Sequence, residues 1–483
     1  MKLKRLLVLA LSVLLAFGAV ACGGSGSGDS GDPGNGGKTK IKVEFLLAGY
    51  GETAFEKITQ AFLARPENSD ITIELVPNEN VNGETGTKLQ AGRADKLSDV
   101  YYGEFLSSVR RWTILDYIEP IDDVMEMTVP GESITVAENI LPGSLESRKM
   151  IKGGETHYWS LPHNISVSSF LYNKKLFDKY GLEIPTTTAE LLEFCDTVMS
   201  MNLKNYKGSP ITPYTYCGAA NDGYWGNILH TWWLQASGVE KVDEFSKYES
   251  PDIYADPGRL RMYQVFNEVA FNSTYHPANI MSKDHTTAQK EFLEGAAFLL
   301  PCGSWFEKEM EDWIPYYADY CDARIMNVPM ICGEDGLPMS DTQYLWEGAS
   351  DAWFIPKAIS ETKKAAAKRF LAFVASDEAS NIWTKYAGGI RGYNYDISKT
   401  SALYAELTPF QQSACDVVNS SVIYRMNTTS PLALQSYAST FPWQYSPFVA
   451  LRDGIKDPHG YWTQEQTYAS SQWETWKENV GLA

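Results

Sequence analysis

The sequence predicts an α/β fold built as two lobes. From residue 41 onwards, segments with the periodicity of strands alternate with segments of helical periodicity, and the same alternation returns in the second half of the chain. Strands and helices that follow one another in this way form sheets covered by helices. The chain has 483 residues, which exceeds what one hydrophobic core usually holds and therefore predicts two lobes.

The first part of the chain has the order strand, helix, strand. Apolar and polar residues alternate over 41–47, which predicts a strand. Thr53 and Glu56 have the spacing of a capping box, and the apolar residues after them fall on one helical face, which predicts a helix. Residues 71–76 and 98–102 are predicted as the next two strands.

Two later helices have clear start signals. Thr187 and Glu190 form a second capping-box pattern shortly after Pro185. Another helix is predicted after Ser360, with apolar residues at helical spacing on one face. Three lysines lie on its other side and are expected to form a solvated face: Lys363, Lys364 and Lys368.

The N-terminus has the features of a secretory signal. Basic residues precede an apolar run over 6–20, which is too short to span a bilayer. Residues 19–22, Ala-Val-Ala-Cys, resemble a bacterial lipobox, so removal of residues 1–21 would leave Cys22 as a lipidated N-terminus. A flexible Gly/Ser linker completes residues 22–40. The expected location is the extracellular face of the bacterial cell membrane; the alternative is a secreted protein with an incidental cysteine.

Charge and motifs exclude several classes of function. The formal net charge is −19 at pH 7, whereas nucleic acids and anionic membrane surfaces bind a basic face, so neither is an expected partner. The sequence holds no CxxC pair, no HExxH and no GxSxG, so no metal, cofactor or catalytic centre is predicted. A monomer is expected. The cysteines after Cys22 are expected to be mostly free thiols: Cys195, Cys217, Cys302, Cys321, Cys332 and Cys415.

Aromatic residues with polar neighbours favour a sugar ligand. The chain has 28 Tyr and 14 Trp against 20 Phe, and they cluster near polar residues at 101–105, 157–164, 220–227, 302–306 and 442–445. A pyranose has C–H groups on its faces and hydroxyls at its rim, so it packs on an amphipathic ring while polar side chains take the hydroxyls. For any single ring, ordinary core packing is the alternative.

Four segments carry a resemblance to a known family. The run YWSLPHNISVSSFLYNKKLFDKYGLEIPTTTAELLEF, residues 158–194, resembles the family 1 extracellular solute-binding proteins, which are the carbohydrate receptors of ATP-driven importers. Residues 97–105, 293–306 and 351–393 resemble the same family in the same order. The resemblance implies a two-lobed fold like that of periplasmic binding proteins, with a ligand cleft between the lobes and hinge crossings.

The resemblance also implies boundaries within the chain. The first lobe would comprise 41–164 and 328–357, and the second lobe 165–327 and 358–483. The crossings would lie near residues 162–166, 327–329 and 355–358.

Ligand-binding positions follow from the same resemblance. They are Tyr50, Glu52, Glu104, Asn164, Trp225, Trp305 and Arg391, with Trp443 as a weaker candidate. The implied function is a lipid-anchored receptor, not an enzyme, that binds an oligosaccharide without a cofactor, closes around it and presents it to the permease subunits of an ABC transporter. Two alternatives stay open: a receptor for a peptide or a cationic solute, and a surface glycoside hydrolase whose carboxylates would come from Glu104, Asp222, Glu347 and Asp351.

Overall fold

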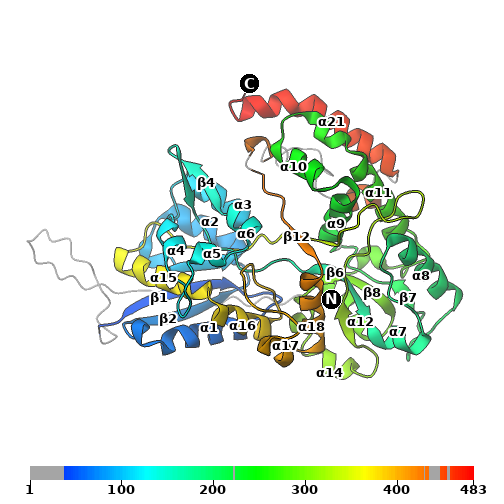
Figure 1. Ribbon diagram of the computed structural model, residues 1–483, viewed down its shortest axis with the longest axis horizontal. Coiled ribbons are helices and arrows are strands. Elements are labelled where there is room, and N and C mark those ends of the chain that lie inside the picture. The colour runs from blue at the N-terminus through cyan, green and yellow to red at the C-terminus, as the bar shows by residue number, and fades with distance from the viewer. Residues whose placement is uncertain (1–36, 221–223, 429, 434–446, 454–456, 483) are drawn as a thin grey trace, which may run out of the picture. The chain divides into compact units, whose positions relative to one another are not determined.

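The first lobe is built on a four-stranded sheet with the order β11-β3-β1-β2 (Figure 1). β1 pairs in parallel with β2 and β3, and β11 pairs antiparallel with β3 at the edge of the sheet. The bounds are Thr39–Leu46 for β1, Ile71–Asn78 for β2, Val100–Gly103 for β3 and Ala352–Phe354 for β11. The first three strands confirm the sequence prediction, and β11 shows that the chain returns to this lobe late in the sequence.

The computed structural model describes residues 37–220, 224–428, 430–433, 447–453 and 457–482. The predicted signal sequence, Cys22 and most of the predicted linker lie outside the described residues, as do Asp222 and Trp443. None of the described helices combines the length and the apolar character that a membrane crossing needs.

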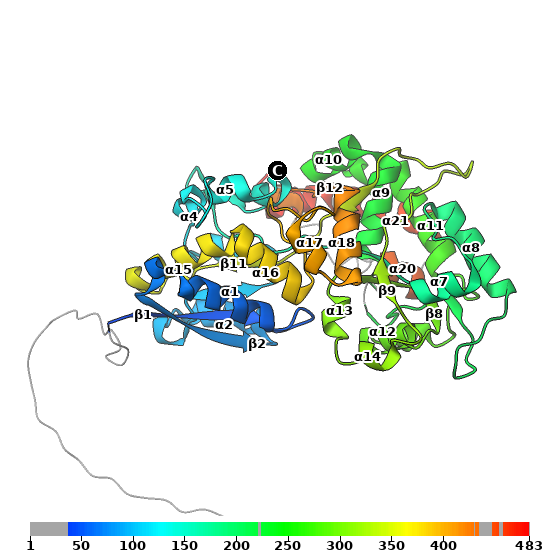
Figure 2. The ribbon, with the colours of Figure 1, turned by 60° about the horizontal axis from the view of Figure 1, so that its bottom comes forward.

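Helices and a hairpin pack around the first sheet (Figure 2). They are α1 Thr53–Ala64, α2 Val81–Ala91, α3 Leu106–Ile114, α4 Asp122–Glu126, α5 Val136–Asn139, α6 Pro142–Glu146, α15 Glu361–Val374 and α16 Asp377–Ala387, with β4 Lys149–Lys152 and β5 Glu155–Tyr158. The helix predicted after the first strand is present, but its predicted capping box is wrong. Thr53 is already the first helical residue, and the N-cap residue Glu52 makes no capping hydrogen bond with its side chain.

The lysines of α15 do not form the solvated face that the sequence predicted. Lys364 Nζ lies 3.0 Å from a carboxylate oxygen of Glu119, and Lys368 Nζ lies 2.8 Å from one of Asp123. Lys363 Nζ lies 3.1 Å from a carboxylate oxygen of Asp99, which is fully buried. These ion pairs fasten α15 to the first lobe on one side while its apolar residues pack into the core on the other.

The second lobe has its own four-stranded sheet, with the order β7-β8-β6-β9. Its strands are β6 Ser168–Asn173, β7 Thr212–Tyr214, β8 Ala297–Gly303 and β9 Ala323–Ile325, and a separate parallel pair is formed by β10 Tyr344–Trp346 and β12 Val422–Tyr424. The capping box predicted at Thr187 is confirmed. The Thr187 side chain accepts a hydrogen bond from the backbone N–H of Glu190, and the Glu190 side chain accepts one from the backbone N–H of Thr187.

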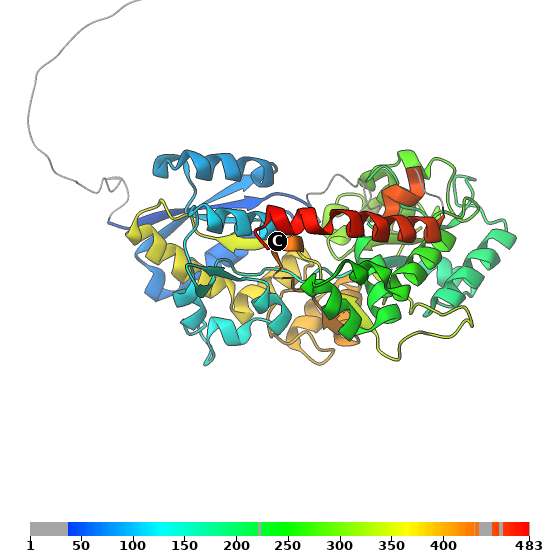
Figure 3. The same ribbon diagram turned by 90° about the horizontal axis from the view of Figure 1, so that it is seen from above.

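Further helices complete the second lobe. They are α7 Lys174–Tyr180, α8 Thr188–Ser200, α9 Gly226–Ser237, α10 Val239–Lys247, α11 Pro257–Ala270, α12 His285–Leu293, α13 Phe306–Glu309, α14 Ile314–Tyr317, α17 Ala402–Glu406, α18 Pro409–Asn419, α20 Pro447–Asp453 and α21 Pro458–Asn479. The C-terminal helix α21, red in Figure 3, packs on α11. A buried ion pair holds it there, with Arg259 Nη2 2.5 Å from Glu465 Oε1.

Three clusters of buried hydrophobic residues show where the chain passes between the lobes. The first-lobe core takes residues from 41–161 and 352–393, and the main second-lobe core takes residues from 170–346 and 432–476. A third cluster takes residues between 165 and 345 and between 390 and 417. The chain therefore crosses at about residues 162–167, 347–351 and 394–397. Two predicted boundaries need correction.

Residues 328–346, predicted in the first lobe, lie with the second, because β10 pairs with β12 and packs on α9. Residues 358–393, predicted in the second lobe, lie with the first, because α15 and α16 pack on β1 and α1. The second and third crossings consequently come later in the chain than residues 327–329 and 355–358.

The six cysteines among the described residues are buried free thiols, which confirms the sequence prediction.

Candidate functional site

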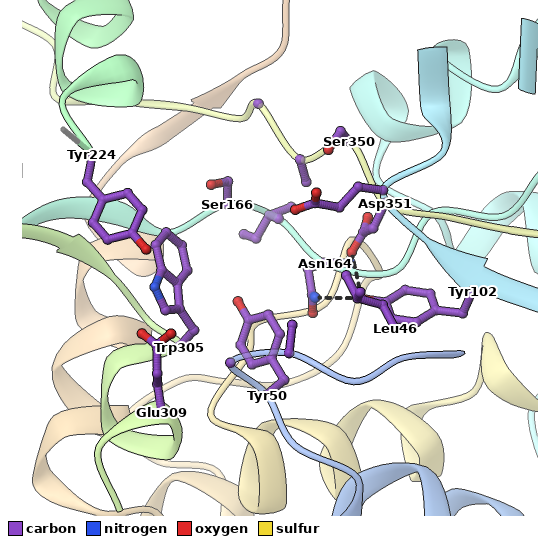
Figure 4. A pocket seen from close by; sticks show the side chains of 16 residues that line it. Leu46, Tyr50, Tyr102, Asn164, Ser166, Tyr224, Trp305, Glu309, Ser350 and Asp351 are labelled. Carbon is purple, nitrogen blue, oxygen red and sulfur yellow. Dashed lines mark hydrogen bonds between the residues drawn. The ribbon is translucent and has the colours of Figure 1, made fainter. Parts of the chain in front are cut away.

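A cavity of about 380 Å³ lies between the two lobes (Figure 4). Its walls come from the loop after β1 and the end of β3 in the first lobe, and from Tyr224, two residues before α9, and the turn from β8 to α13 in the second. Residues 164–166 and 348–351, in two of the crossing segments, complete it. This volume falls within the range of about 300–1,000 Å³ that is typical of small-molecule sites. A ligand here would touch both lobes and the hinge.

Tyr50 forms part of the first-lobe wall. It lies in the loop between β1 and α1, where Gly51 adopts a φ of 65° that lets the chain turn. The Tyr50 hydroxyl oxygen lies 3.3 Å from Ser304 Oγ in the second lobe, and its ring centroid lies 5.4 Å from that of Trp383. Burial raises the pKa of Tyr50, so its hydroxyl stays protonated and can donate a hydrogen bond. Tyr50 thus links the two lobes beside the cavity.

Trp305 forms the opposite wall. It lies at the end of the turn that follows β8, and its ring is half-buried and lines the cavity. The ring packs over Gly303, where an added Cβ would come within 2.1 Å of the Trp305 ring, so glycine is required there. The ring of Tyr224 meets Trp305 edge-on with centroids 5.6 Å apart. Figure 4 shows these two rings side by side. Part of the indole therefore remains open to a ligand.

Asp351 lies in the second crossing segment and is held by two donors. Its Oδ2 accepts hydrogen bonds from the backbone N–H of Asn164 at 3.0 Å and from the Tyr102 hydroxyl at 3.2 Å. The Asn164 side-chain amide lies 3.5 Å from the same hydroxyl, as Figure 4 shows. Burial raises the pKa of Asp351, and the charge of Arg148 opposes this shift.

Two further carboxylates line the cavity. Glu104 follows β3, and its Oε2 accepts a hydrogen bond from Asn82 Nδ2 at 3.3 Å. Its side chain is exposed within the cavity, yet the surrounding protein and then the charge of Asp351 raise its pKa. Glu309 belongs to α13, and its Oε2 accepts a hydrogen bond from Gln289 Nε2 at 2.6 Å. The described lining residues thus offer acceptors from both lobes.

The cavity brings together four of the seven predicted binding residues. Tyr50, Glu104, Asn164 and Trp305 all line it, although they come from four separate regions of the sequence.

The other three predicted residues do not line the cavity. Glu52 is an exposed residue at the start of α1. Trp225 is fully buried in the second-lobe core, with its ring centroid 5.4 Å from those of Phe170 and Phe266. Arg391 is also buried, and its guanidinium donates to the carbonyl oxygens of His163 and Val374 at 2.9 Å each. Arg391 therefore holds backbone together next to the first crossing.

Sequence reasoning missed several lining residues, among them Tyr102, Tyr224 and Glu309, and it considered Asp351 only as a hydrolase carboxylate. Tyr224 could have been predicted from the sequence, because it directly precedes Trp225 in the aromatic cluster at 220–227. That cluster indicated the right segment, but not which of the two rings turns outward.

Hydrolytic or metal chemistry finds limited support among the described residues. Of the carboxylates considered for a hydrolase, Glu347 is buried in an ion pair with Arg425 and does not line the cavity. Asp222 lies outside the described residues. In the part of the chain that the structure describes, no group of three or more His, Cys, Asp or Glu side chains could hold a metal ion.

A family model described as bacterial extracellular solute-binding protein matches residues 48–381. Among curated proteins, no match to the chain was found.

Several solved structures are similar to this chain along most of its length. A structure of the bacterial solute receptor AcbH, described as having an exclusive preference for β-D-galactopyranose, has a TM-score of 0.64 at 16% identity and covers 91% of this chain and 99% of its own. RafE in complex with raffinose has a TM-score of 0.62 at 16% identity, with coverages of 90% and 99%. MalE from Bdellovibrio bacteriovorus, bound to maltotriose, has a TM-score of 0.60 at 16% identity, with coverages of 90% and 100%. At these identities the likeness shows the fold.

Proposed function

The chain belongs to the family of bacterial extracellular solute-binding proteins, and from this premise we propose that it is a receptor that binds an oligosaccharide in the cavity between its lobes. AcbH, RafE and MalE share its fold, and their ligands are β-D-galactopyranose, raffinose and maltotriose. These ligands support a sugar as the ligand class. The side chains that line the cavity give further support for a sugar ligand.

The proposal rests mainly on the Trp305 ring, which is half-buried and lines a cavity rich in hydrogen-bond acceptors. The C–H face of a pyranose packs on such an aromatic surface, and Tyr224 extends that surface at its edge. The rim hydroxyls then meet Asn164, Asp351 and Glu104, which lie on the other side of the same cavity. Aromatic faces and acceptors placed together suit a sugar better than a wholly apolar or an anionic ligand.

Binding at this position would close the two lobes on the ligand. A ligand can stabilise a closed state only through contacts that the open state lacks, and a sugar between Tyr50 and Trp305 would make contacts to both lobes. The pair formed by the hydroxyls of Tyr50 and Ser304 already joins the lobes beside the cavity. We therefore propose hinge closure about the crossing segments.

The transport role rests on the N-terminal sequence and the family. Cys22 would carry the lipid that anchors the receptor at the extracellular face of the cell membrane, and the linker to residue 40 would let the folded part move above the surface. The closed, loaded receptor would deliver the sugar to the permease subunits of an ABC transporter.

The test is a panel of mono- and oligosaccharides titrated into the purified protein by calorimetry. We expect at least one to bind with a Kd of about 1 μM, or about −8 kcal/mol. Tyr224→Ala should weaken this binding, whereas Tyr316→Ala, which alters a tyrosine that is 76% exposed on α14 and does not line the cavity, should leave it unchanged. Binding of no sugar, or equal effects of the two substitutions, would contradict the proposal.

The same samples separate a receptor from a glycoside hydrolase. After prolonged incubation with each bound oligosaccharide, chromatography should recover the sugar intact. The appearance of shorter products would replace the receptor with an enzyme, for which Glu104 and Asp351 would be the remaining described carboxylates at the cavity.

A further inference from the structure

The ionisable lining of the cavity carries an unbalanced negative charge. Among the described residues that line it, the carboxyl groups of Glu104, Glu309 and Asp351 are present, and no Lys, Arg or His is. Glu104 and Asp351 lie close enough for the charge of Asp351 to raise the pKa of Glu104. The cavity therefore concentrates like charges where a ligand would sit.

Asp351 differs from the other buried carboxylates among the described residues. Five such side chains are buried, and four have a Lys or Arg partner within ion-pair distance: Glu44 with Lys88, Asp99 with Lys363, Glu347 with Arg425 and Glu465 with Arg259. Asp351 has none. Arg148 reaches only its backbone carbonyl oxygen, at 2.7 Å.

One oxygen of Asp351 also lacks a hydrogen bond. Its Oδ2 takes both donors, the Asn164 backbone and the Tyr102 hydroxyl, whereas Oδ1 has no partner among the described residues. The residue is only 7% exposed and lines the cavity. A buried carboxylate that forms no ion pair is costly even with guanidinium charges farther away, and the cost is relieved when a cation or a strong donor arrives. At the four other buried carboxylates, a Lys or Arg side chain within ion-pair distance offsets this cost.

The geometry points to a ligand that supplies an ion-pair partner for Asp351: a sugar with a protonated amine that lies between Glu104 and Asp351. This inference rests on the proposed sugar receptor and narrows its substrate class from neutral oligosaccharides to amino sugars. A hydroxyl donates one hydrogen bond and leaves the negative charge in place. An ammonium group donates three and cancels the charge, so it satisfies Asp351 Oδ1 and Glu104 together.

The experiment compares sugars that differ only in the amine. Calorimetric titrations would use glucosamine with glucose, galactosamine with galactose, and the β-1,4-linked glucosamine disaccharide with cellobiose. We expect the amino member of the best-binding pair to bind at least about tenfold more tightly than its neutral partner. A neutral partner that binds equally or more tightly overturns this inference and leaves the sugar receptor standing. If no member of any pair binds while another neutral sugar of the panel does, this inference fails and the sugar receptor stands; if no sugar of the panel binds either, both fail.

Substitution of single carboxylates tests whether Glu104 supplies the negative charge that recognises the amine. Glu104→Gln keeps the shape and an acceptor oxygen but removes the charge, so it should reduce the ratio of amino-sugar affinity to neutral-sugar affinity to about threefold or less. Glu52→Gln is the matched control, because Glu52 is an exposed carboxylate that does not line the cavity. Thermal melting of both variants confirms that they are folded. A full amine preference in Glu104→Gln, or an equal loss in Glu52→Gln, overturns the assignment.

Discussion

Trp305→Ala distinguishes a binding surface from a core residue. The substitution removes the indole but keeps the turn that begins at Gly303, over which the ring packs. In the folded protein the ring packs on Gly303 and Gly49 and touches Tyr224 at its edge, and the remaining surface lines the cavity. A sugar that covers this open surface would gain the burial energy of one large apolar group. We therefore expect the substitution to cost about 1–3 kcal/mol of binding free energy, roughly a tenfold to hundredfold rise in Kd.

Trp225→Ala is the matched comparison, because it removes the same side chain from a different environment. Trp225 is 0% exposed and packs among aromatic rings of the second-lobe core. Its loss should cost about 3–5 kcal/mol of unfolding free energy, the range for a buried tryptophan. The loss for Trp305 should be smaller, because part of that ring is already exposed in the folded state.

Both quantities can be measured on the same preparations. Calorimetric titration with the tightest sugar of the panel gives the affinity, and thermal melting gives the change in stability. We expect Trp305→Ala to lose affinity with a small change in Tm, and Trp225→Ala to lose Tm while its folded fraction binds normally. A fall in Tm for Trp305→Ala as large as that for Trp225→Ala, with affinity unchanged, would show that Trp305 is a core residue and not part of the binding surface.

Three further predictions concern the anchor, closure and pH. Cys22→Ser should release the protein from the membrane fraction without changing its affinity for sugar; a variant that stays membrane-bound would argue against a lipid anchor. Saturating sugar should reduce the radius of gyration measured by small-angle scattering, and an unchanged radius would count against hinge closure. Burial and the charge of Asp351 raise the pKa of Glu104 in the folded protein above its value in the unfolded chain. Protonation of Glu104 therefore stabilises the folded protein. This contribution is complete at a pH below the pKa of the unfolded chain and is lost as the pH rises through the pKa of the folded protein. Glu104→Gln should accordingly melt at a higher temperature than the wild type at pH 7.5, with the gap closing near pH 4, and a gap that does not change with pH would show that the charge is not the cause.

Local patterns in the sequence predicted local structure well. The alternation over 41–47 became β1, and the capping box at Thr187 starts α8, because both depend on residues close together in the chain. Lobe boundaries depend on distant partners. Nothing within residues 344–346 shows that they pair with residues 422–424, or that α15 returns to pack on β1. The predicted second and third crossings were wrong for that reason, whereas the first, at residues 162–166, agrees with the structure.

The directions of the site side chains also depend on packing between distant segments, and for this reason only some of the binding residues were predicted correctly. Residues 220–227 were identified as a segment rich in aromatics, but the side chains of Tyr224 and Trp225 diverge where α9 begins. One turns to Trp305 and the other into the core. Arg391 has the chemistry of a sugar contact, yet its donors are used by backbone carbonyls at the hinge. Residue type indicated the chemistry, and only the packing showed where each side chain faces.

Whether a sugar binds between the lobes would be seen in a crystal structure of the complex with the tightest sugar of the panel. We predict a pyranose ring packed on Trp305, with its polar groups within hydrogen-bond distance of Asn164 or Asp351 and contacts to both lobes. A sugar bound elsewhere, or held by one lobe alone with Trp305 uncovered, would contradict the claim.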